Sequence, residues 1–286
     1  LSKVVKLDDE GLITSYQLYS SGIQILASVG EAYGTLFGTS YVRDANGSIV
    51  VDANGLPKIS TTNKTLGKFT PDWTGGISNT FSYRSLSLSF LIDASVGGSI
   101  FSNTNKTGKY TGVLANTLSG RDAEHGGLWY YTAAMGNNVR LPESPSYSVS
   151  SDGLYYAQVN GQSTRVYQDG IMVEGVTESG SKNEEVVSAE KYYHRIYSIA
   201  EANVYDASYV KLREVALSYR LPRLWTQKLH LQEASVTLTG RNLWTIYKSV
   251  PNIDPESALT TGNAQGVEAY SLPTTRSFGV NLSVKF

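Results

Sequence analysis

The chain has 286 residues, a formal net charge of -1 and no cysteine. The near-neutral charge argues against a nucleic-acid partner, which would require a basic surface, and the absence of cysteine excludes disulfide bridges, iron–sulfur clusters and cysteine-based zinc sites. No run of 18 or more apolar residues occurs, so a transmembrane helix is excluded, whereas a membrane-spanning β-strand needs only about ten alternating residues.

Five segments alternate between apolar and polar residues with a period of two, the pattern of β-strands that have one apolar and one polar face. We expect strands at residues 74–83, 86–101, about 207–221, 234–247 and 275–286. Near Val210 and Leu212 the alternation changes phase, which predicts a bulge or the point at which the strand emerges above the membrane. Asn242 and Leu243 interrupt the alternation of the fourth segment.

The links between these strands alternate strictly between short and long. The short links are Arg84-Ser85 and about 222–233, and the long links are about 1–73, 102–206 and 248–274. Short periplasmic turns and long extracellular loops are typical of outer-membrane barrels, and long unstructured loops are uncommon in compact soluble domains. The sequence therefore predicts an all-β fold, an antiparallel transmembrane β-barrel in the outer membrane of a Gram-negative cell, with the C-terminus in the periplasm.

Five strands are too few to close a barrel, which needs about eight. We therefore expect residues 1–286 to form the C-terminal part of a larger barrel whose further strands precede Leu1. The terminal Phe286, at the end of an alternating strand, matches the C-terminal signal of outer-membrane proteins. A soluble antiparallel sheet also has one wet face, so a soluble glycan-binding or adhesin domain is the alternative.

The sequence contains no recognisable catalytic, phosphate-binding or metal-binding motif, so we expect neither an enzyme nor a cofactor. The three histidines, His125, His194 and His230, are far apart. Residues 44–47 and 52–55 repeat the sequence Asp-Ala-Asn-Gly, which suits two tight turns. Calcium binding is the alternative for this repeat, but the remaining ligands of an EF-hand loop are missing.

Aromatic residues cluster in the longest predicted loop. They are Trp129, Tyr130, Tyr131, Tyr155, Tyr156, Tyr192 and Tyr193. Aromatic side chains stack on sugar rings and anchor protein interfaces, so these residues are candidates for contacts with a substrate or a partner protein. The alternative is that they pack the loop against itself.

Two charged residues fall on the polar faces of predicted strands. Asp93 and Arg241 are candidates for lining the barrel lumen, and the alternative is a structural ion pair in the barrel wall. Aromatic residues near the strand ends suit the interfacial girdle of a membrane barrel, with a soluble core as the competing interpretation. They are Tyr83, Trp225, Trp244 and Tyr247.

Several stretches resemble the SusC/RagA family of TonB-dependent transporters, in the family's order and over essentially the whole chain. Gly30–Gly38 resembles its GE-x-Y-G-x-x-Y-G loop, Thr70–Tyr83 resembles PDWTGG-x-x-NTFSY, and Ala207–Val215 resembles ASYVKLRNV. The closing motifs are matched by residues 240–243 (GRNL), 254–256 (DPE) and 272–276 (LPTTR).

The resemblance implies a barrel of roughly 22 strands with an N-terminal plug that lies outside this chain. It also implies active import of an oligosaccharide or peptide, driven by the TonB complex through that plug, with a SusD-like lipoprotein over the extracellular mouth. A siderophore or cobalamin receptor and a passive porin are the membrane alternatives. The motifs do not indicate which residues contact substrate.

Overall fold

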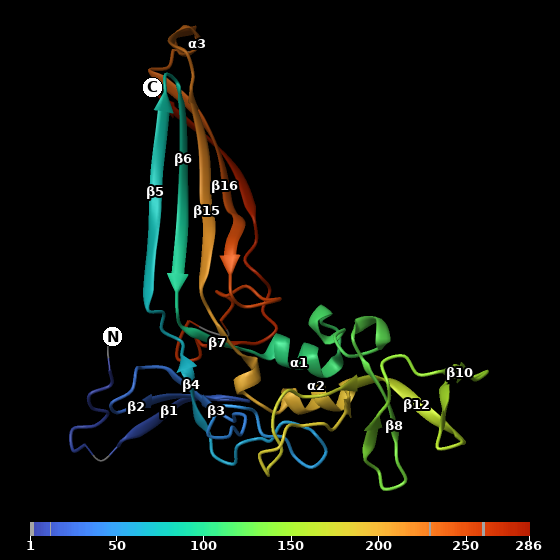
Figure 1. The fold of residues 1–286 in the computed structure, drawn as a ribbon. Coiled ribbons are helices and arrows are strands. Elements are labelled where there is room, and N and C mark those ends of the chain that lie inside the picture. The colour runs from blue at the N-terminus through green and yellow to red at the C-terminus, as the bar shows by residue number, and fades with distance from the viewer. Residues whose placement is uncertain (1–2, 12, 229, 259–260) are drawn as a thin grey trace.

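The computed structural model describes residues 3–11, 13–228, 230–258 and 261–286. A tall antiparallel sheet stands on a broad base (Figure 1). The sheet has the strand order β18-β16-β15-β6-β5. Its strands are β5 (Trp73–Tyr83), β6 (Leu86–Val96), β15 (Tyr209–Arg220), β16 (Glu233–Lys248) and β18 (Ser277–Lys285). All five predicted strands are therefore confirmed within a few residues.

The second predicted strand is shorter than expected. It stops at Val96 because Gly97 and Gly98 both adopt positive φ angles, 74° and 79°, a conformation that glycine reaches without steric cost. The chain then turns into β7 (Ser99–Ser102), which belongs to a different sheet. The prediction of one continuous strand over 86–101 was wrong at this break.

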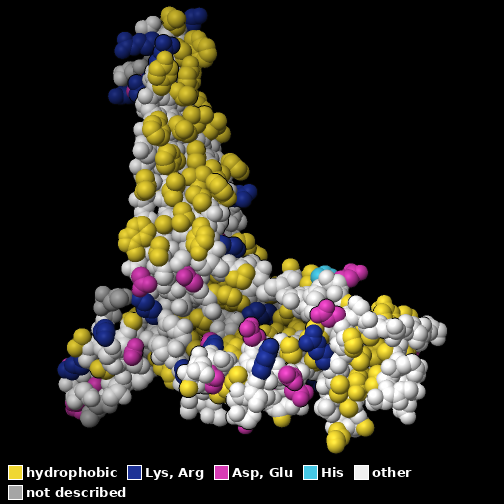
Figure 2. Space-filling view, viewed as in Figure 1, with side chains coloured by type: hydrophobic (Ala, Val, Ile, Leu, Met, Phe, Trp, Pro, Cys, Tyr) yellow, Lys and Arg dark blue, Asp and Glu magenta, His cyan; other side chains and the backbone are white. Residues whose placement is uncertain are grey.

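Apolar side chains form continuous rows across the tall sheet. One row crosses all five strands by direct pairing and consists of Phe81, Leu88, Leu217, Leu238 and Val280. Their exposed fractions range from 38% to 73%, so no other part of the described chain covers them. Figure 2 shows the resulting apolar surface over the tall sheet.

The neighbouring row on the opposite face is polar. It consists of Ser82, Ser87, Ser218, Thr237 and Asn281. Hydroxyl groups bond to one another across the strands, with 2.6 Å between the Oγ atoms of Ser82 and Ser87. The alternation in the sequence thus becomes one apolar and one polar face, as expected from the strand geometry.

The predicted bulge lies between Leu212 and Glu214, where the pairing with both neighbouring strands shifts register. On β16 the interruption at Asn242 and Leu243 is part of the same irregularity, and Asn242 has a positive φ of 52°. The tight turn at Arg84 and Ser85 is also confirmed, with a φ of 54° at Arg84.

The short links lie at one end of the tall sheet and the base lies at the other (Figure 1). Helix α3 (Arg223–Lys228) occupies the link between β15 and β16. Positions 1–2, 12, 229 and 259–260 of the predicted links lie outside the described residues. None of the helices in the described part of the chain is both long and apolar enough to cross a membrane.

The base is folded rather than irregular. A four-stranded sheet contains β1 (Ser15–Ser20), β2 (Gln24–Ser28), β3 (Thr35–Gly38) and β4 (Lys64–Lys68), and a three-stranded sheet joins β7 to β14 (Val204–Asp206) and β17 (Val267–Glu268). Helices α1 (Asn103–Thr111) and α2 (Ala189–Tyr197) pack together beside these sheets. Short 3-10 turns occur at η1 (Ala115–Thr117), η2 (Ala123–His125) and η3 (Glu201–Asn203).

A separate lobe extends from the helices and is built on one sheet. Its strands are β8 (Leu128–Thr132), β9 (Asn138–Arg140), β10 (Tyr147–Val149), β11 (Tyr155–Val159), β12 (Gln162–Ile171) and β13 (Val187–Ser188). Among the described residues, the buried apolar clusters lie in the base and this lobe, not on the tall sheet. The largest joins Ile25, Leu36, Phe101 and Val267, which come from the two base sheets.

The apolar face of the tall sheet predicts an asymmetric response to charge. Val280 and Asn281 are adjacent on β18, and both are exposed. If lipid contacts the apolar face, Val280→Arg lowers the free energy of unfolding by about 2–4 kcal/mol. The matched Asn281→Arg places the same charge on the polar face and changes the free energy of unfolding by less than about 1 kcal/mol. Urea unfolding of the full-length protein in phospholipid vesicles measures both, and equal losses would contradict a lipid-facing band.

Candidate functional site

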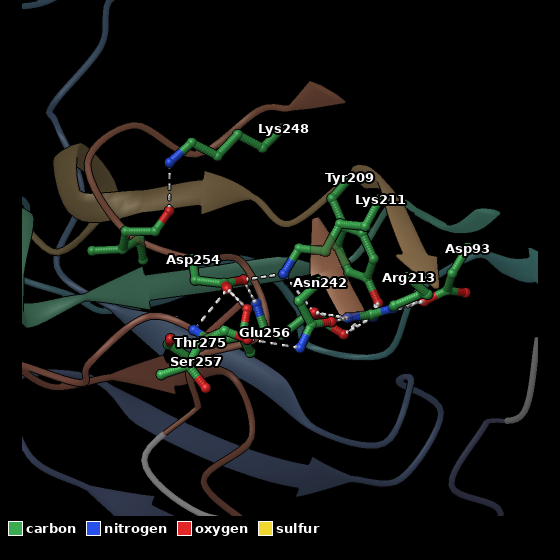
Figure 3. Close-up of polar contacts among 12 residues, drawn as sticks. Asp93, Tyr209, Lys211, Arg213, Asn242, Lys248, Asp254, Glu256, Ser257 and Thr275 are labelled. Carbon is green, nitrogen blue, oxygen red and sulfur yellow. Dashed lines mark hydrogen bonds and ion pairs between the residues drawn. The ribbon is translucent and has the colours of Figure 1, made fainter. Parts of the chain in front are cut away.

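Charged residues gather where the tall sheet meets the base. Lys211 and Arg213 project from β15, Asp93 from β6, and Asp254 and Glu256 from the link between β16 and β18 (Figure 3). We call these five residues the junction network. Its two cations, Lys211 and Arg213, lie at the phase change of β15, where the bulge alters the direction of side chains that would otherwise alternate between the faces.

Lys211 is the most deeply buried member of the junction network. Its side chain is 3% exposed, and its Nζ atom lies 2.5 Å from Asp254 Oδ1 and 2.5 Å from Glu256 Oε2. A buried ammonium is stable only when its charge is paired and its protons are hydrogen-bonded. Lys211 therefore ties the link 249–276 to the third strand of the sheet.

Arg213 extends the network to a second strand. Its Nε and Nη2 atoms donate to Asp93 Oδ2 at 2.9 and 2.7 Å, and its Nη1 donates to Glu256 Oε2 at 2.7 Å. The Tyr209 hydroxyl donates to the same Glu256 carboxylate at 2.9 Å. A planar guanidinium holds two carboxylates in a fixed geometry, so β6, β15 and the link are joined through one side chain.

The ionisation of Asp254 depends on these contacts. Burial by itself would raise the pKa of this carboxyl, but hydrogen bonds from Lys211, from Thr274 and from the backbone amide of Glu256 outweigh burial and lower the pKa to about 2. Hydrogen bonds from Arg213 and Lys211 likewise outweigh burial and lower the pKa of Glu256. Both carboxylates are therefore ionised at neutral pH.

A polar cavity of about 370 Å³ adjoins the junction network. Trp244, Lys248 and Arg276 line it together with Lys211 and Asp254. The Lys248 ammonium donates to the Ile253 carbonyl at 2.7 Å, which closes the turn at the start of the link. The arrangement can hold a loop or contact a polar ligand.

Glu268 makes a second connection between the same link and the base. Its side chain is fully buried and accepts hydrogen bonds from Ser102 Oγ at 2.7 Å and Thr104 Oγ1 at 2.6 Å. The backbone amide of Thr104, in the first turn of α1, also donates to it at 3.3 Å. A carboxylate at a helix N-terminus satisfies free amides and interacts favourably with the helix dipole.

The two predicted lumen residues do not pair with each other. Asp93 binds Arg213 within the junction network, whereas Arg241 forms an exposed ion pair with Glu214 at 2.9 Å. Each therefore has a neighbouring strand partner on the tall sheet. Whether either side chain lines a lumen stays a prediction.

The loop aromatics have diverse surroundings. Trp129 and Tyr130 are buried at 4% exposure, and Trp129 stacks on Tyr147 at 4.8 Å between ring centroids. The partly exposed residues are Tyr131, Tyr155, Tyr156, Tyr192 and Tyr193. Tyr131 and Tyr155 pack against the lobe core, whereas Tyr192 and Tyr193 lie on α2. The loop aromatics that are neighbours in the predicted loop therefore lie in two places, the lobe and helix α2.

The Asp-Ala-Asn-Gly repeats form turns, as predicted. Asp44 Oδ1 accepts from the amides of Asn46 and Ser48, and Asp52 Oδ1 accepts from the corresponding amides of its own turn. In both turns the glycine has a positive φ. The second aspartate also pairs with Arg195 of α2 at 3.0 Å, so that turn is fastened to the helix.

Sequence reasoning did not single out Lys211, Arg213, Asp254 or Glu256 as a site, although all four lie in the stretches that carry the family resemblance. The available signal was the pair of cations at the phase change of one strand and the Asp-Pro-Glu pair in a long link. Oppositely charged pairs so placed can compensate each other when buried.

The uncovered apolar rows, the polar opposite face and the base at one end are features of outer-membrane β-barrel proteins. No protein-family model matches the chain. It is 25% identical to TonB-dependent receptor P3 of Formosa agariphila over 286 aligned residues, which cover 98% of this chain and 22% of that protein.

Solved structures agree at the level of the fold. The RagAB peptide importer in the open-open state has a TM-score of 0.50 and 16% sequence identity, with 99% of this chain and 25% of that chain covered. The RagAB peptide transporter gives a TM-score of 0.50, 15% identity and coverage of 98% and 25%. This chain spans about a quarter of each. The chain is therefore similar in sequence to a TonB-dependent receptor and similar in fold to a segment of the RagAB structures, in agreement with the resemblance found in the sequence.

The junction network predicts a large difference between buried and exposed charge. Lys211→Met leaves the buried Asp254 carboxylate without its cation and removes one of the two cations that pair with Glu256. It therefore lowers the free energy of unfolding by about 3–5 kcal/mol. Arg241→Met removes an exposed ion pair and costs less than about 1 kcal/mol. Urea unfolding of the full-length protein in detergent micelles compares the two. Equal losses in the two variants would show that the junction network stabilises the fold no more than an exposed ion pair does.

The low pKa of Asp254 predicts acid sensitivity of the link 249–276. The folded pKa of about 2 lies below the ordinary value of 3.8, so the folded state binds fewer protons. The stabilisation is complete above pH about 4 and is lost as the pH falls towards 2. Urea midpoints measured between pH 5 and 2 should fall more steeply for the natural protein than for Asp254→Asn. Parallel curves would contradict the assignment.

Proposed function

We propose that this chain is the part of a TonB-dependent importer that forms one section of an outer-membrane barrel wall and its extracellular loops. The imported nutrient is an oligosaccharide or a peptide, and a SusD-like lipoprotein covers the extracellular mouth. The observation that carries the proposal is the apolar row through Phe81, Leu88, Leu217, Leu238 and Val280, which no protein layer covers in the described structure.

The strand edges support a membrane barrel. Among the described residues, β5 and β18 are each paired on one side only. Backbone groups in lipid must be hydrogen-bonded, and an open sheet edge cannot remain in the hydrocarbon core. Both edges therefore require strands from the remainder of a longer protein, in agreement with a chain that spans about a quarter of its relatives.

The aromatic residues at the two ends of the apolar rows support a sheet that spans the membrane from one interface to the other. Tyr83 and Trp225 lie at the end with short links, and Trp244 and Tyr247 lie near the base. All four are more than half exposed. Rings at both membrane interfaces are typical of outer-membrane barrels. We assign the short-link end and the C-terminus to the periplasm and the base to the extracellular side.

The base is the region that would meet the substrate and the lipoprotein lid. We assign the packing of the lobe to Trp129 and Tyr130, and contacts with the ligand or the lid to the partly exposed tyrosines of the lobe and α2. The energy for release comes from TonB through a plug in the remainder of the protein. The relatives are a receptor and an importer, which favours transport over catalysis.

Deletion of tonB in the native host tests active transport. Uptake of fluorescent maltooligosaccharides and of a labelled casein hydrolysate is measured in cells with the full-length protein, with and without TonB. Deletion should reduce uptake of the transported probe at least tenfold, because passage requires movement of the plug. Unchanged uptake of a transported probe would refute active import and favour a passive porin.

Copurification tests the partner. The full-length protein, extracted in detergent, should retain a SusD-like lipoprotein that mass spectrometry identifies. A siderophore or cobalamin receptor would be isolated without such a lipoprotein. A protein that stays soluble without detergent would instead support the adhesin alternative.

A further inference from the structure

Basic side chains gather at the short-link end of the tall sheet, the end farthest from the base (Figure 2). They come from the turn between β5 and β6, from the ends of β15 and β18, and from α3. They are Arg84, Arg220, Arg223, Lys228 and Lys285, and all five are exposed. We call these five residues the end cations.

Backbone pairing makes the end cations neighbours across the sheet. The amide of Arg220 donates to the carbonyl of Ser85 at 2.8 Å, directly beside Arg84. Lys285 pairs with Glu233 across β18 and β16, and Glu233 Oε1 lies 2.8 Å from Arg220 Nε. Helix α3 begins three residues after Arg220. The end cations therefore form one group at one end of the sheet.

The end cations outnumber the carboxylates around them. Among the described side chains at this end, Glu233 is the one carboxylate, and it pairs with Arg220. The other four end cations have no carboxylate at ion-pair distance in the described part of the chain. The base end of the sheet instead carries charges of both signs, such as the Lys68–Asp72 pair at 2.6 Å and the junction network. The excess of positive charge at the short-link end thus requires negative charge from outside the chain.

Helix α3 adds apolar side chains beside these charges. Thr226 marks the buried side of the helix, with 3% exposure. Because an α-helix turns by about 100° per residue, Leu224 and Lys228 lie on the outward face, with Trp225 beside them. Leu224 is 73% exposed and Trp225 is 58% exposed. Apolar and basic residues together on an outward helix surface suit the boundary between lipid headgroups and acyl chains.

The height of the sheet places this end at the membrane boundary. Strand β5 has eleven residues, which at about 3.4 Å per residue and a tilt of about 40° rise about 26 Å through the membrane. That height matches the apolar band of about 25 Å in outer-membrane barrels. Arg84 follows β5 directly, and its guanidinium lies 5.2 Å from the ring centroid of Tyr83. The end cations therefore lie at the level of the lipid headgroups.

A membrane boundary satisfies both parts of this surface, whereas water satisfies only the charges. Periplasmic water would leave Leu224 and Trp225 exposed at an apolar cost. In a leaflet, acyl chains cover these two side chains, and the long stems of lysine and arginine carry their charges to the phosphates. Anionic headgroups attract basic residues most strongly, so charge complementarity selects them over zwitterionic lipids.

We propose that the end cations and α3 form a docking surface for anionic phospholipid headgroups in the periplasmic leaflet of the outer membrane. Arg223 and Lys228 contact the headgroup phosphates while Leu224 and Trp225 enter the acyl chains. The surface continues the apolar rows of the tall sheet. It rests on the barrel-wall placement made under the proposed function, and it adds a lipid partner at the side opposite the substrate.

A fluorophore on α3 tests this surface in the full-length protein. Gln227 is an exposed residue of α3, and Gln227→Cys provides the attachment site, with the unsubstituted protein labelled in parallel as background. The protein is reconstituted in phosphatidylcholine vesicles that contain nitroxide-labelled phosphatidylglycerol or nitroxide-labelled phosphatidylcholine. Both leaflets have the same composition, so the direction of insertion does not matter. The anionic lipid should quench the fluorophore at least about threefold more strongly than the zwitterionic lipid.

Removal of two end cations locates the preference. Arg223→Gln combined with Lys228→Gln should bring the quenching ratio of the two lipids close to one, because the charges that attract the anionic headgroup are lost. Lys64→Gln combined with Lys182→Gln removes the same charge from exposed positions outside the tall sheet and should leave the ratio unchanged.

Replacement of the apolar residues separates insertion from charge. Leu224→Gln combined with Trp225→Gln should weaken quenching by both lipids, because α3 then loses its contact with the acyl chains, while the anionic lipid remains the stronger quencher.

Three results would overturn the proposal. They are a quenching ratio of one at α3 in the otherwise natural protein, an unchanged ratio after Arg223→Gln with Lys228→Gln, and loss of the ratio when excess glycerol 3-phosphate is added at constant ionic strength. The last result would indicate a site for a small soluble anion instead of a membrane surface.

Insertion into the membrane has a separate readout. After a carbonate wash, flotation shows whether the full-length protein remains in the vesicles. Protein that remains embedded without any preference for phosphatidylglycerol keeps the barrel-wall placement and rejects the lipid surface. Protein that the wash releases contradicts the barrel-wall placement itself.

Discussion

Hydrogen bonding between neighbouring strands is the constraint on which the tall sheet depends, because no protein layer covers either of its faces in the described structure. A soluble sheet gains much of its stability by burying an apolar face against a second layer. Here the buried clusters lie elsewhere, around Phe101 in the base and Trp129 in the lobe. Lipid on one face and neighbouring strands at both edges complete the environment that this sheet requires.

The junction network solves a different physical problem at the end of the sheet. Strand pairing fixes β6 and β15 relative to each other but does not position the link 249–276. Lys211 and Arg213 place two cations among three carboxylates, and the geometry satisfies most of their hydrogen-bonding groups. Such a site is costly to break on one side, so it holds a surface loop more firmly than exposed ion pairs would.

The strands of the tall sheet were predictable because their signal is local. Each strand is nine or more residues long, and the alternation within it reports directly on the two faces. The base was not predictable in the same way. Its strands are as short as two residues, and its core joins Ile25, Phe101 and Val267 from distant parts of the sequence. The adjacent glycines 97 and 98 were visible in the sequence, but the sheet that β7 joins was not.

The position of β17 in the sequence determines when folding of the base can be completed. Val267 pairs in parallel with Phe101 of β7, and Glu268 bonds to Ser102 across 166 residues of chain. Closing so long a segment carries a large entropic cost before any contact is gained. A nascent or secreted chain that ends before Val267 and Glu268 therefore lacks one wall of the base core, and assembly of the base is completed only after these residues have arrived.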